Sequence, residues 1–558
     1  MIRRRLVLMV LLMSALLSAD GARDYKDALK RWKKTDKHFW QEFKTDWKNA
    51  YLTLRDPLEK AQAKPKENKD AVRDYSDIEA LYKAYEEAEK ERGAAAAAYA
   101  SSGEAKALET LFKELLDLGK AVNKLEKELD DGKPNRGRYI FDQSVGIRRH
   151  ALGVRQTMLP KAIAQAPGAA EFLAGAGWAQ AAKKDGKASI VRRVGVIDAI
   201  AALPTDQRAA AKTRLLETLK APQSSLRVAA VDALAAWEGA GVEPLLEALS
   251  DQNPIVRRAT LEVARDPRFI KPVLGTLADA EGLERAEHLA VLHRLTKQKF
   301  GTDMAAWKEW YEAYADEIEA GKFDVESVEE QEVEKGAEPE TISFFGVRTM
   351  SHRIGFALEA SFMLEIPAEV EFQRTRYIYD WYGSNPSWRK GHPSHQMALF
   401  DQLQRTLGGW PPEASFTLSL LHQNFQVTSF GEKKPLGGKV RDIKDVLKKI
   451  EKLRGNGWCS QYEGIKEAMR IGRMPKGAID FPNPHTDTIF LWGVGGPRGG
   501  RFMWFKAAAD AVARLNRFRR VRIHALRIGY EQETGAALME AIAKRTGGTY
   551  VWLKEPPA

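Results

Sequence analysis

Two oxygen-bearing side chains, Glu359 and Ser361, follow the short apolar run 354–358 in the last two-fifths of the chain. The run has no polar alternation, which predicts a strand buried on both faces, the first strand of a parallel sheet. Open α/β sheets bind ligands at the edge where such strands end. The sequence therefore predicts that Glu359 and Ser361 stand on a ligand-binding rim.

The stretch 353–363 resembles the opening of a von Willebrand factor A (VWA) domain, where a strand leads into Asp-x-Ser-x-Ser. The segments 343–347 (Ser-Phe-Phe-Gly-Val) and 547–551 (Gly-Gly-Thr-Tyr-Val) are similar to those of bacterial members. The resemblance covers residues 342–558. It implies a doubly wound, Rossmann-like α/β fold with a rim cation that a partner's carboxylate completes.

The resemblance also implies where the ligands of that cation would fall. It matches the first aspartate with Glu359, the first serine with Ser361 and the second serine with Met363. The family threonine falls on Cys459, and the third acidic position falls on Val494. Hard cations such as Mg²⁺ prefer oxygen ligands, and a thioether or a hydrocarbon is a poor substitute. We therefore expect a degenerate site without a metal or another cofactor.

Two readings of this rim stay open. A shift by one residue offers Ser460 in place of Cys459, so that Glu359, Ser361 and Ser460 would still bind Mg²⁺ in a cation-dependent adhesin. Without a metal, the rim would instead dock a protein partner. The predicted partner-binding positions are Glu359, Ser361, Ser460, Gly495 and Arg498.

Other residues suggest catalysis only weakly. His392 and His395 lie three positions apart, but Pro393 interrupts the helix that would aim both at one metal. Cys459 is a possible reactive thiol, although no neighbouring histidine is present to activate it. The glycine-rich segment 495–501 precedes a predicted helix and could hold an anion, but it lacks a P-loop lysine. An envelope hydrolase or redox enzyme using Cys459 or His392 and His395 is therefore an alternative only.

Composition restricts the class of protein. The 558 residues include 44% hydrophobic residues, enough for several packed domains. The single cysteine excludes an intramolecular disulfide and a cysteine-rich zinc site. The net charge of +11 arises from 87 basic and 76 acidic residues, a mixture typical of solvated helices. Without a basic run or a recognition motif, we expect no nucleic-acid binding.

The N-terminus has the layout of a secretory signal. Three arginines at 3–5 precede the apolar stretch 6–17 and the small residues Ser18 and Ala19. The apolar stretch is short for a membrane span. We predict a signal peptide over 1–22 and an exported mature chain, periplasmic or extracellular, without a membrane span.

Residues 23–140 show helical periodicity. Apolar residues recur at steps of three and four from Leu108 to Leu129, which predicts a coiled-coil seam of about three heptads. A turn is expected at 101–103. The pattern predicts a helical hairpin, and dimerisation through the seam is left open.

Residues 141–320 resemble HEAT-type helical repeats. Similar segments surround Arg192, Arg227 and Arg257, which are spaced by 35 and 30 residues. Such a period predicts an α-solenoid of stacked helix pairs, with these arginines tying neighbouring repeats together. An irregular helical domain is the alternative. Residues 321–341 are rich in acidic residues, which predicts an extended linker between the two halves.

Beyond the linker, apolar runs and helical patterns alternate, which favours an α/β sheet over 342–558. The predicted strands after the first are 415–421, 425–430, 488–492, 521–528 and 550–553, and the predicted helices are 395–407, 439–453, 461–469, 502–515 and 533–545. Solenoids and VWA rims both suit protein contacts. The sequence thus favours an exported, non-enzymatic scaffold that binds one or more protein partners.

Overall fold

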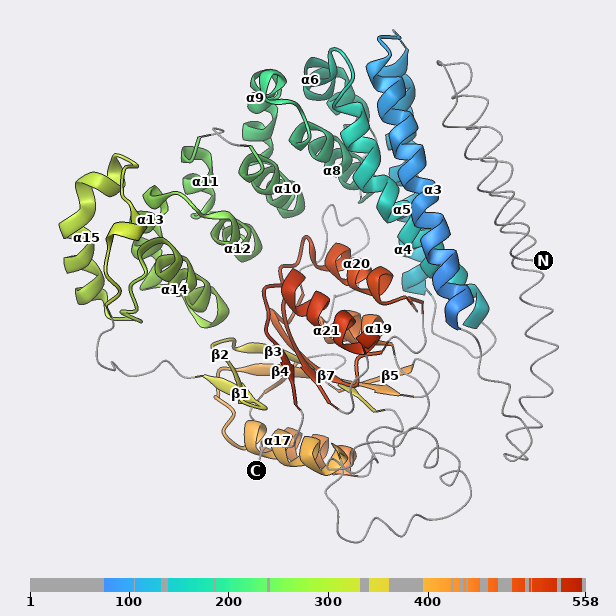
Figure 1. Cartoon of the computed structure of the whole chain (residues 1–558). Coiled ribbons are helices and arrows are strands. Elements are labelled where there is room, and N and C mark those ends of the chain that lie inside the picture. The colour runs from blue at the N-terminus through green and yellow to red at the C-terminus, as the bar shows by residue number, and fades with distance from the viewer. Residues whose placement is uncertain are drawn as a thin grey trace, which may run out of the picture.

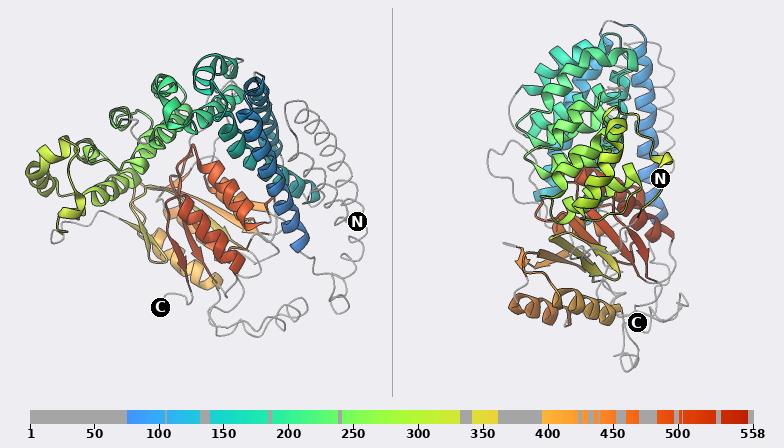
Figure 2. Two further views of the ribbon diagram at one scale, coloured as in Figure 1. Left: turned by 45° about the horizontal axis from the view of Figure 1, so that its top comes forward. Right: turned by 90° about the vertical axis from the view of Figure 1, so that its left-hand side faces the viewer.

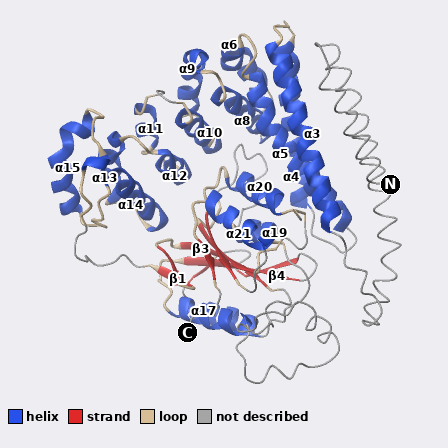
Figure 3. Cartoon of the chain, in the orientation of Figure 1, coloured by secondary structure: helices blue, strands red, loops and turns tan. Residues whose placement is uncertain are grey.

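The computed structural model describes residues 75–104, 106–131, 139–183, 187–237, 241–331, 341–360, 395–422, 426–430, 435–437, 440–451, 460–469, 484–496, 501–502, 504–528 and 533–553. The elements of this part before residue 331 are all helices, and its strands lie between Ile342 and Trp552 (Figures 1 and 3). The predicted division into an all-α N-terminal half and an α/β C-terminal half is confirmed at this level.

The helices of the N-terminal half follow one another as a curved array around the α/β half (Figure 2). They are α3 (Tyr75–Ser101), α4 (Ala107–Asp131), α5 (Tyr139–Ile163), α6 (Ala169–Phe172), α7 (Trp178–Ala182), α8 (Lys187–Ala201), α9 (Arg208–Thr218), α10 (Ser224–Ala235), α11 (Glu243–Ala248), α12 (Pro254–Val263), α13 (Ile270–Leu277), α14 (Gly282–Thr296) and α15 (Met304–Glu319). A π-helical turn, Leu173–Gly177, joins α6 to α7. Helices α8, α10, α12 and α14 pack side by side in that order.

The leucine row predicted to form a coiled-coil seam lies on α4 and is covered inside the chain. Leu111, Leu118 and Val122 are buried because α4 packs against α5 and α8. The sequence left dimerisation through this row open, and the structure shows the row packed within the chain. Helix α5 also packs along α3, so the predicted boundary at residue 140 falls within one packed unit.

Two of the three repeat arginines connect successive helix pairs, as predicted. Arg227 of α10 donates to both carboxylate oxygens of Asp251, at 2.6 and 2.8 Å. Arg257 of α12 donates to both oxygens of Glu284 on α14, at 2.5 and 2.7 Å. Arg192 differs, because it donates to the carbonyl of Ala181 at the end of α7.

The segment predicted to be an extended linker is partly folded onto the array. Phe323 and Val328 are buried in the core of the array. Glu326 pairs with Lys297 at 2.8 Å, and Gln298 donates to the carbonyl of Glu329 at 2.9 Å. The prediction is therefore wrong for residues 321–331, because two apolar side chains anchor an otherwise acidic stretch. Residues 332–340 lie outside the described part.

The sheet of the C-terminal half has the order β5-β4-β3-β7-β8-β9 within the described residues, with β6 also paired to β4. Neighbours among β4, β3, β7, β8 and β9 are parallel, and β5 and β6 run antiparallel to β4. A separate hairpin is formed by β1 (Ile342–Phe344) and β2 (Val347–Thr349). The sheet strands are β3 (Arg353–Glu359), β4 (Ser415–His422), β5 (Gln426–Phe430), β6 (Leu436–Gly437), β7 (Thr488–Gly493), β8 (Arg522–Arg527) and β9 (Tyr550–Trp552).

Helices cover both faces of this sheet. One core contains Phe356, Phe416 and Phe490 with side chains of α17 and α18, and the other contains Ala357 and Ile523 with those of α19, α20 and α21. Strand residues of alternating parity thus serve the two cores, as the apolar runs predicted. The helices are α17 (His395–Gly408), α18 (Val440–Glu451), α19 (Gln461–Ala468), α20 (Phe505–Asn516) and α21 (Glu533–Arg545).

The two halves share a core at one end of the array. Tyr82 of α3 and Ile147 of α5 belong to the same buried cluster as Trp504 and Ala508 at α20. The rings of Tyr82 and Trp504 lie 5.8 Å apart. The expectation that a linker keeps the halves apart is therefore wrong, because apolar side chains of α3 and α5 complete the packing of α20.

Candidate functional site

The carboxyl ends of β3 and β7 mark the point where the strand order reverses. From this pair, β4 and β5 extend to one side, while β8 and β9 extend to the other. Ligands of open α/β sheets bind in the crevice outside such a point. Glu359 is the last residue of β3, so the structure places it where the sequence predicts a rim residue.

The Glu359 carboxylate turns toward the end of β7. Its Oε2 accepts a hydrogen bond from the backbone N–H of Val494 at 2.8 Å, and the residue is 8% exposed. A Cβ at Gly493 would lie only 2.3 Å from the same oxygen. A glycine in β7 therefore makes room for the carboxylate, which joins two adjacent strands.

Two of the positions that the resemblance to VWA domains matches with cation ligands are described, Glu359 and Val494. Val494, matched with the third acidic position, has a buried aliphatic side chain, and its N–H donates to an oxygen of Glu359. Within the described part of the chain, no group of three or more His, Cys, Asp or Glu side chains could hold a metal ion. Ser361, Met363 and Cys459 lie outside the described residues.

Ser460 and Gly495 lie at this edge but are buried. Ser460 precedes α19 and is 3% exposed. Gly495 has φ +88°, and a Cβ there would meet Gly535 and Met539 of α21. Glu359, Ser460 and Gly495, three of the five predicted partner-binding positions, are therefore buried within the chain. The other two, Ser361 and Arg498, lie outside the described residues.

The edge contains a charged pair that sequence reasoning missed. Arg501 is 4% exposed, and its Nη1 lies 3.4 Å from Oε1 of Glu463 on α19. Its carbonyl accepts a hydrogen bond from the Tyr82 hydroxyl of α3 at 3.0 Å. Arg501 is the last residue of the glycine-rich segment considered above for anion binding. Its side chain pairs with α19 and its backbone bonds to α3. The helical half therefore reaches this edge of the sheet.

A second buried polar cluster lies where α3, α5 and α20 meet. His150 of α5 is fully buried, with Nε2 3.1 Å from Oε2 of Glu86 and Nδ1 3.7 Å from Oδ2 of Asp510. Burial, assisted by Arg514, lowers the pKa of His150 to about 4, although both carboxylates oppose this. The imidazole is therefore neutral at neutral pH.

Glu86 stays charged in the same cluster. Burial alone would raise its pKa, but hydrogen bonds from Lys506 and Lys90 outweigh burial and lower the pKa to about 2. Lys506 belongs to α20, so this cluster also joins the two halves. No local motif signals it, because its members come from three distant segments.

The side chains named in the enzyme alternatives are not among those that the structure describes. His392 and Cys459 lie outside the described residues, and His395 begins α17 with its side chain outside them as well.

No protein-family model matches this sequence, and no curated protein matches it either. Among the helices in the described part, none is long and apolar enough to cross a membrane.

Proposed function

We propose that this chain is an exported, non-enzymatic scaffold protein. A HEAT-like array would hold a VWA-like domain that lacks a working cation site, and the domain would dock a protein partner near the carboxyl edge of its sheet. Export is inferred from the signal-like pattern at 1–22.

The observation that carries the proposal is how the array holds a folded domain. Side chains of α8, α10, α12 and α14 form ion pairs with the α/β half, and α3 and α5 share its core. Contacts of this kind, an apolar anchor with charged pairs beside it, are those of a protein-binding surface. They support a role in protein contacts for the array.

A ligand-binding role for the Glu359 carboxylate has less support than a role of the array in protein contacts. Glu359 and Val494 are bonded to each other, which leaves this carboxylate as a link between strands. A charged partner would instead meet side chains that follow β3 and β7 in the sequence, of which Ser361 and Arg498 are the polar candidates.

The test is affinity capture from a cell-envelope extract with the mature chain and with Arg498→Glu and Ser361→Arg. We expect a defined protein to be retained by the unaltered chain and lost with either variant. Lys308→Glu is the matched control, because Lys308 is exposed on α15 of the array. Capture that is equal for the unaltered chain and both rim variants would refute docking at this rim.

The same capture distinguishes the enzyme alternatives. Alkylation of Cys459 and replacement of His392 and His395 by alanine should leave the retained protein unchanged. Loss of capture after these changes would instead support a role for those residues.

A further inference from the structure

Arg501 lies where three parts of the molecule meet at the carboxyl edge of the sheet. It follows the glycine-rich stretch 495–500, its side chain pairs with Glu463 of α19, and its carbonyl accepts a hydrogen bond from the Tyr82 hydroxyl of α3. Tyr82 is 1% exposed and Arg501 is 4% exposed. The hydrogen bond between them is therefore buried, and it connects residues 419 positions apart in the chain.

Helix α5 leaves room for the same carbonyl. A Cβ at Gly146 of α5 would lie 1.6 Å from the carbonyl oxygen of Arg501 and 2.9 Å from the hydroxyl oxygen of Tyr82. Glycine lowers the stability of a helix interior, so this close approach is a physical reason for its presence here. We call Tyr82, Gly146 and the carbonyl of Arg501 the rim clamp.

The residues that follow this carbonyl are packed by the same helices. The ring of Phe502 lies 4.7 Å from that of Tyr462 on α19. The ring of Trp504 lies 5.8 Å from that of Tyr82 and 5.3 Å from that of His150 on α5. The chain is thus fixed against α3, α5 and α19 before α20 begins.

The other end of the glycine-rich segment is held within the α/β half. A Cβ at Gly495 would lie 2.5 Å from Cγ of Met539 and 2.8 Å from the carbonyl oxygen of Gly535, both on α21. The segment that contains Arg498 therefore has two anchors. The α/β half provides the anchor at Gly495, and the helical half provides the one at Arg501.

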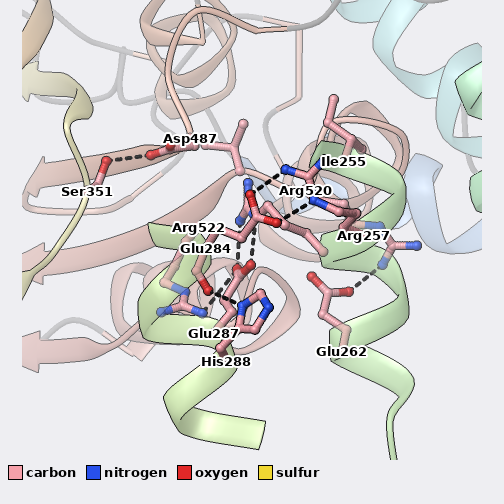
Figure 4. Close-up of polar contacts among 12 residues, drawn as sticks. Ile255, Arg257, Glu262, Glu284, Glu287, His288, Ser351, Asp487, Arg520 and Arg522 are labelled. Carbon is pink, nitrogen blue, oxygen red and sulfur yellow. Dashed lines mark hydrogen bonds and ion pairs between the residues drawn. The ribbon is translucent and has the colours of Figure 1, made fainter. Parts of the chain in front are cut away.

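The array has a separate attachment at the opposite edge of the sheet. Arg522, the first residue of β8, lies 3.2 Å from Oε1 of Glu287 on α14, and Arg520 pairs with Glu262 on α12 (Figure 4). This is the edge where the parallel strands β7 and β8 begin. Because these ion pairs do not involve the rim clamp, a change in the clamp can alter the rim while the halves stay attached.

We propose that Tyr82 is a positioning residue through which the helical half regulates partner binding at the rim. This inference rests on the proposed scaffold function and adds a means of control to it. Docking of α3 fixes one end of segment 495–501 in the conformation that the partner binds. By linkage, a partner that prefers this conformation also strengthens the docking of α3.

Hydrogen exchange of the full chain, measured by mass spectrometry, tests the clamp without a partner. Tyr82→Phe removes only the hydroxyl, and we expect exchange about fivefold faster in the peptide 494–508, the effect of one buried hydrogen bond. Gly146→Ala should accelerate the same peptide further, and peptides of α10 and α12 should not change. Tyr311→Phe is the matched control, because the Tyr311 hydroxyl donates to Glu319 at 3.0 Å on α15, within the array.

Unchanged exchange of the peptide 494–508 in Tyr82→Phe would overturn the inference. Equal acceleration of every peptide would overturn it as well, because Tyr82 would then contribute to global stability alone. Tyr82→Phe decides the matter by itself if Gly146→Ala does not fold by circular dichroism.

Capture from the envelope extract separates this inference from the proposed function. We expect Tyr82→Phe to retain less of the protein whose capture depends on Arg498, and equal retention despite faster exchange would refute regulation. If exchange is unchanged while capture still depends on Arg498, the scaffold proposal stands and only the clamp inference fails. If capture does not depend on Arg498, docking at this rim fails, and the exchange data still decide whether Tyr82 positions the segment.

Discussion

Glu359 shows how one side chain changes the interpretation of a site. The sequence places a carboxylate at the end of the first sheet strand, where a cation ligand is expected from the family resemblance. In the structure the carboxylate accepts the N–H of Val494, and Gly493 leaves the space for it. A buried N–H without an acceptor costs free energy, so Glu359 stabilises the junction of β3 and β7.

We predict that Glu359→Ala lowers the free energy of unfolding by about 1–3 kcal/mol, because the N–H of Val494 loses its acceptor in a buried setting. Glu359→Gln keeps an acceptor oxygen and should cost less. Chemical denaturation of the three proteins measures this. Equal stability of the alanine variant and the unaltered chain would contradict the structural role.

We also predict that Mg²⁺ does not change the melting temperature of the unaltered chain. A bound ion at a hundred times its Kd would add about 2.7 kcal/mol to stability. Calorimetric melting with millimolar Mg²⁺ and with a chelator makes the comparison. A higher Tm with Mg²⁺ that disappears in Glu359→Ala would establish the cation-dependent alternative.

At the scale of elements, the junction of α3, α5 and α20 contains a buried titratable group, His150. His150 is neutral there, next to Glu86, Lys506, Asp510 and Arg514. Its pKa is lowered from 6.5 to about 4 in the folded chain. The unfolded chain therefore binds a proton more readily below pH 6.5, and folding loses stability as the pH falls from 6.5 toward 4.

We predict that this residue removes up to about 3 kcal/mol of stability between pH 6.5 and pH 4, at about 1.4 kcal/mol for each unit of pKa shift. Glutamine does not titrate, so in His150→Gln the free energy of unfolding should depend less steeply on pH. The difference in slope should correspond to the uptake of about one proton on unfolding. Urea denaturation at a series of pH values gives both slopes. Parallel slopes for the two proteins would show that His150 is not the group responsible.

At the same scale, local sequence signals predicted single elements well. Asn253-Pro254 is typical of a helix start, and Asn253 caps α12 by accepting from the N–H of Ile255 at 2.9 Å. Residues 533–545 were predicted as a helix and form α21. Caps and periodicity act within one or two turns, which is why sequence alone reveals them.

At the scale of the whole molecule, the array and the α/β half form one body with two kinds of contact. At α3, α5 and α20 a shared apolar core lies beside the buried His150–Glu86 cluster. Along α8, α10, α12 and α14, ion pairs connect the array to residues 517–522. In the sequence, residues 332–340 connect the helical half to the α/β half, so a protease site inserted there would separate the two halves covalently.

We predict that the folded chain, cleaved at a protease site inserted within 332–340, elutes from size-exclusion chromatography as one species. The shared core should hold the halves together even in high salt, since salt weakens ion pairs and does not weaken apolar burial. Ala508→Glu, which places a charge in that core, should let the cleaved halves separate. Separation of the unaltered cleaved chain in low salt would contradict the packing described here.

The sequence by itself determined the five helices and five strands predicted over 395–553, the division into two halves and the position of a carboxylate at the end of β3. Each depends on neighbours within a few residues, through periodicity, caps and buried apolar runs. A partial signal for the carboxylates that pair with residues 517–522 was also present, since Asp198, Asp232 and Glu262 follow the repeat arginines by six, five and five residues.

Only the tertiary structure decided what those carboxylates contact. Arg517 and Asp198 are 319 residues apart in the chain, and Glu359 and Val494 are 135 apart. No local period relates such residues, because their approach depends on how α5 packs on α20 and how β3 pairs with β7. Packing of α4 against α5 and α8 likewise decided what covers the leucine row, and Phe323 and Val328 of the predicted linker joined the core of the array.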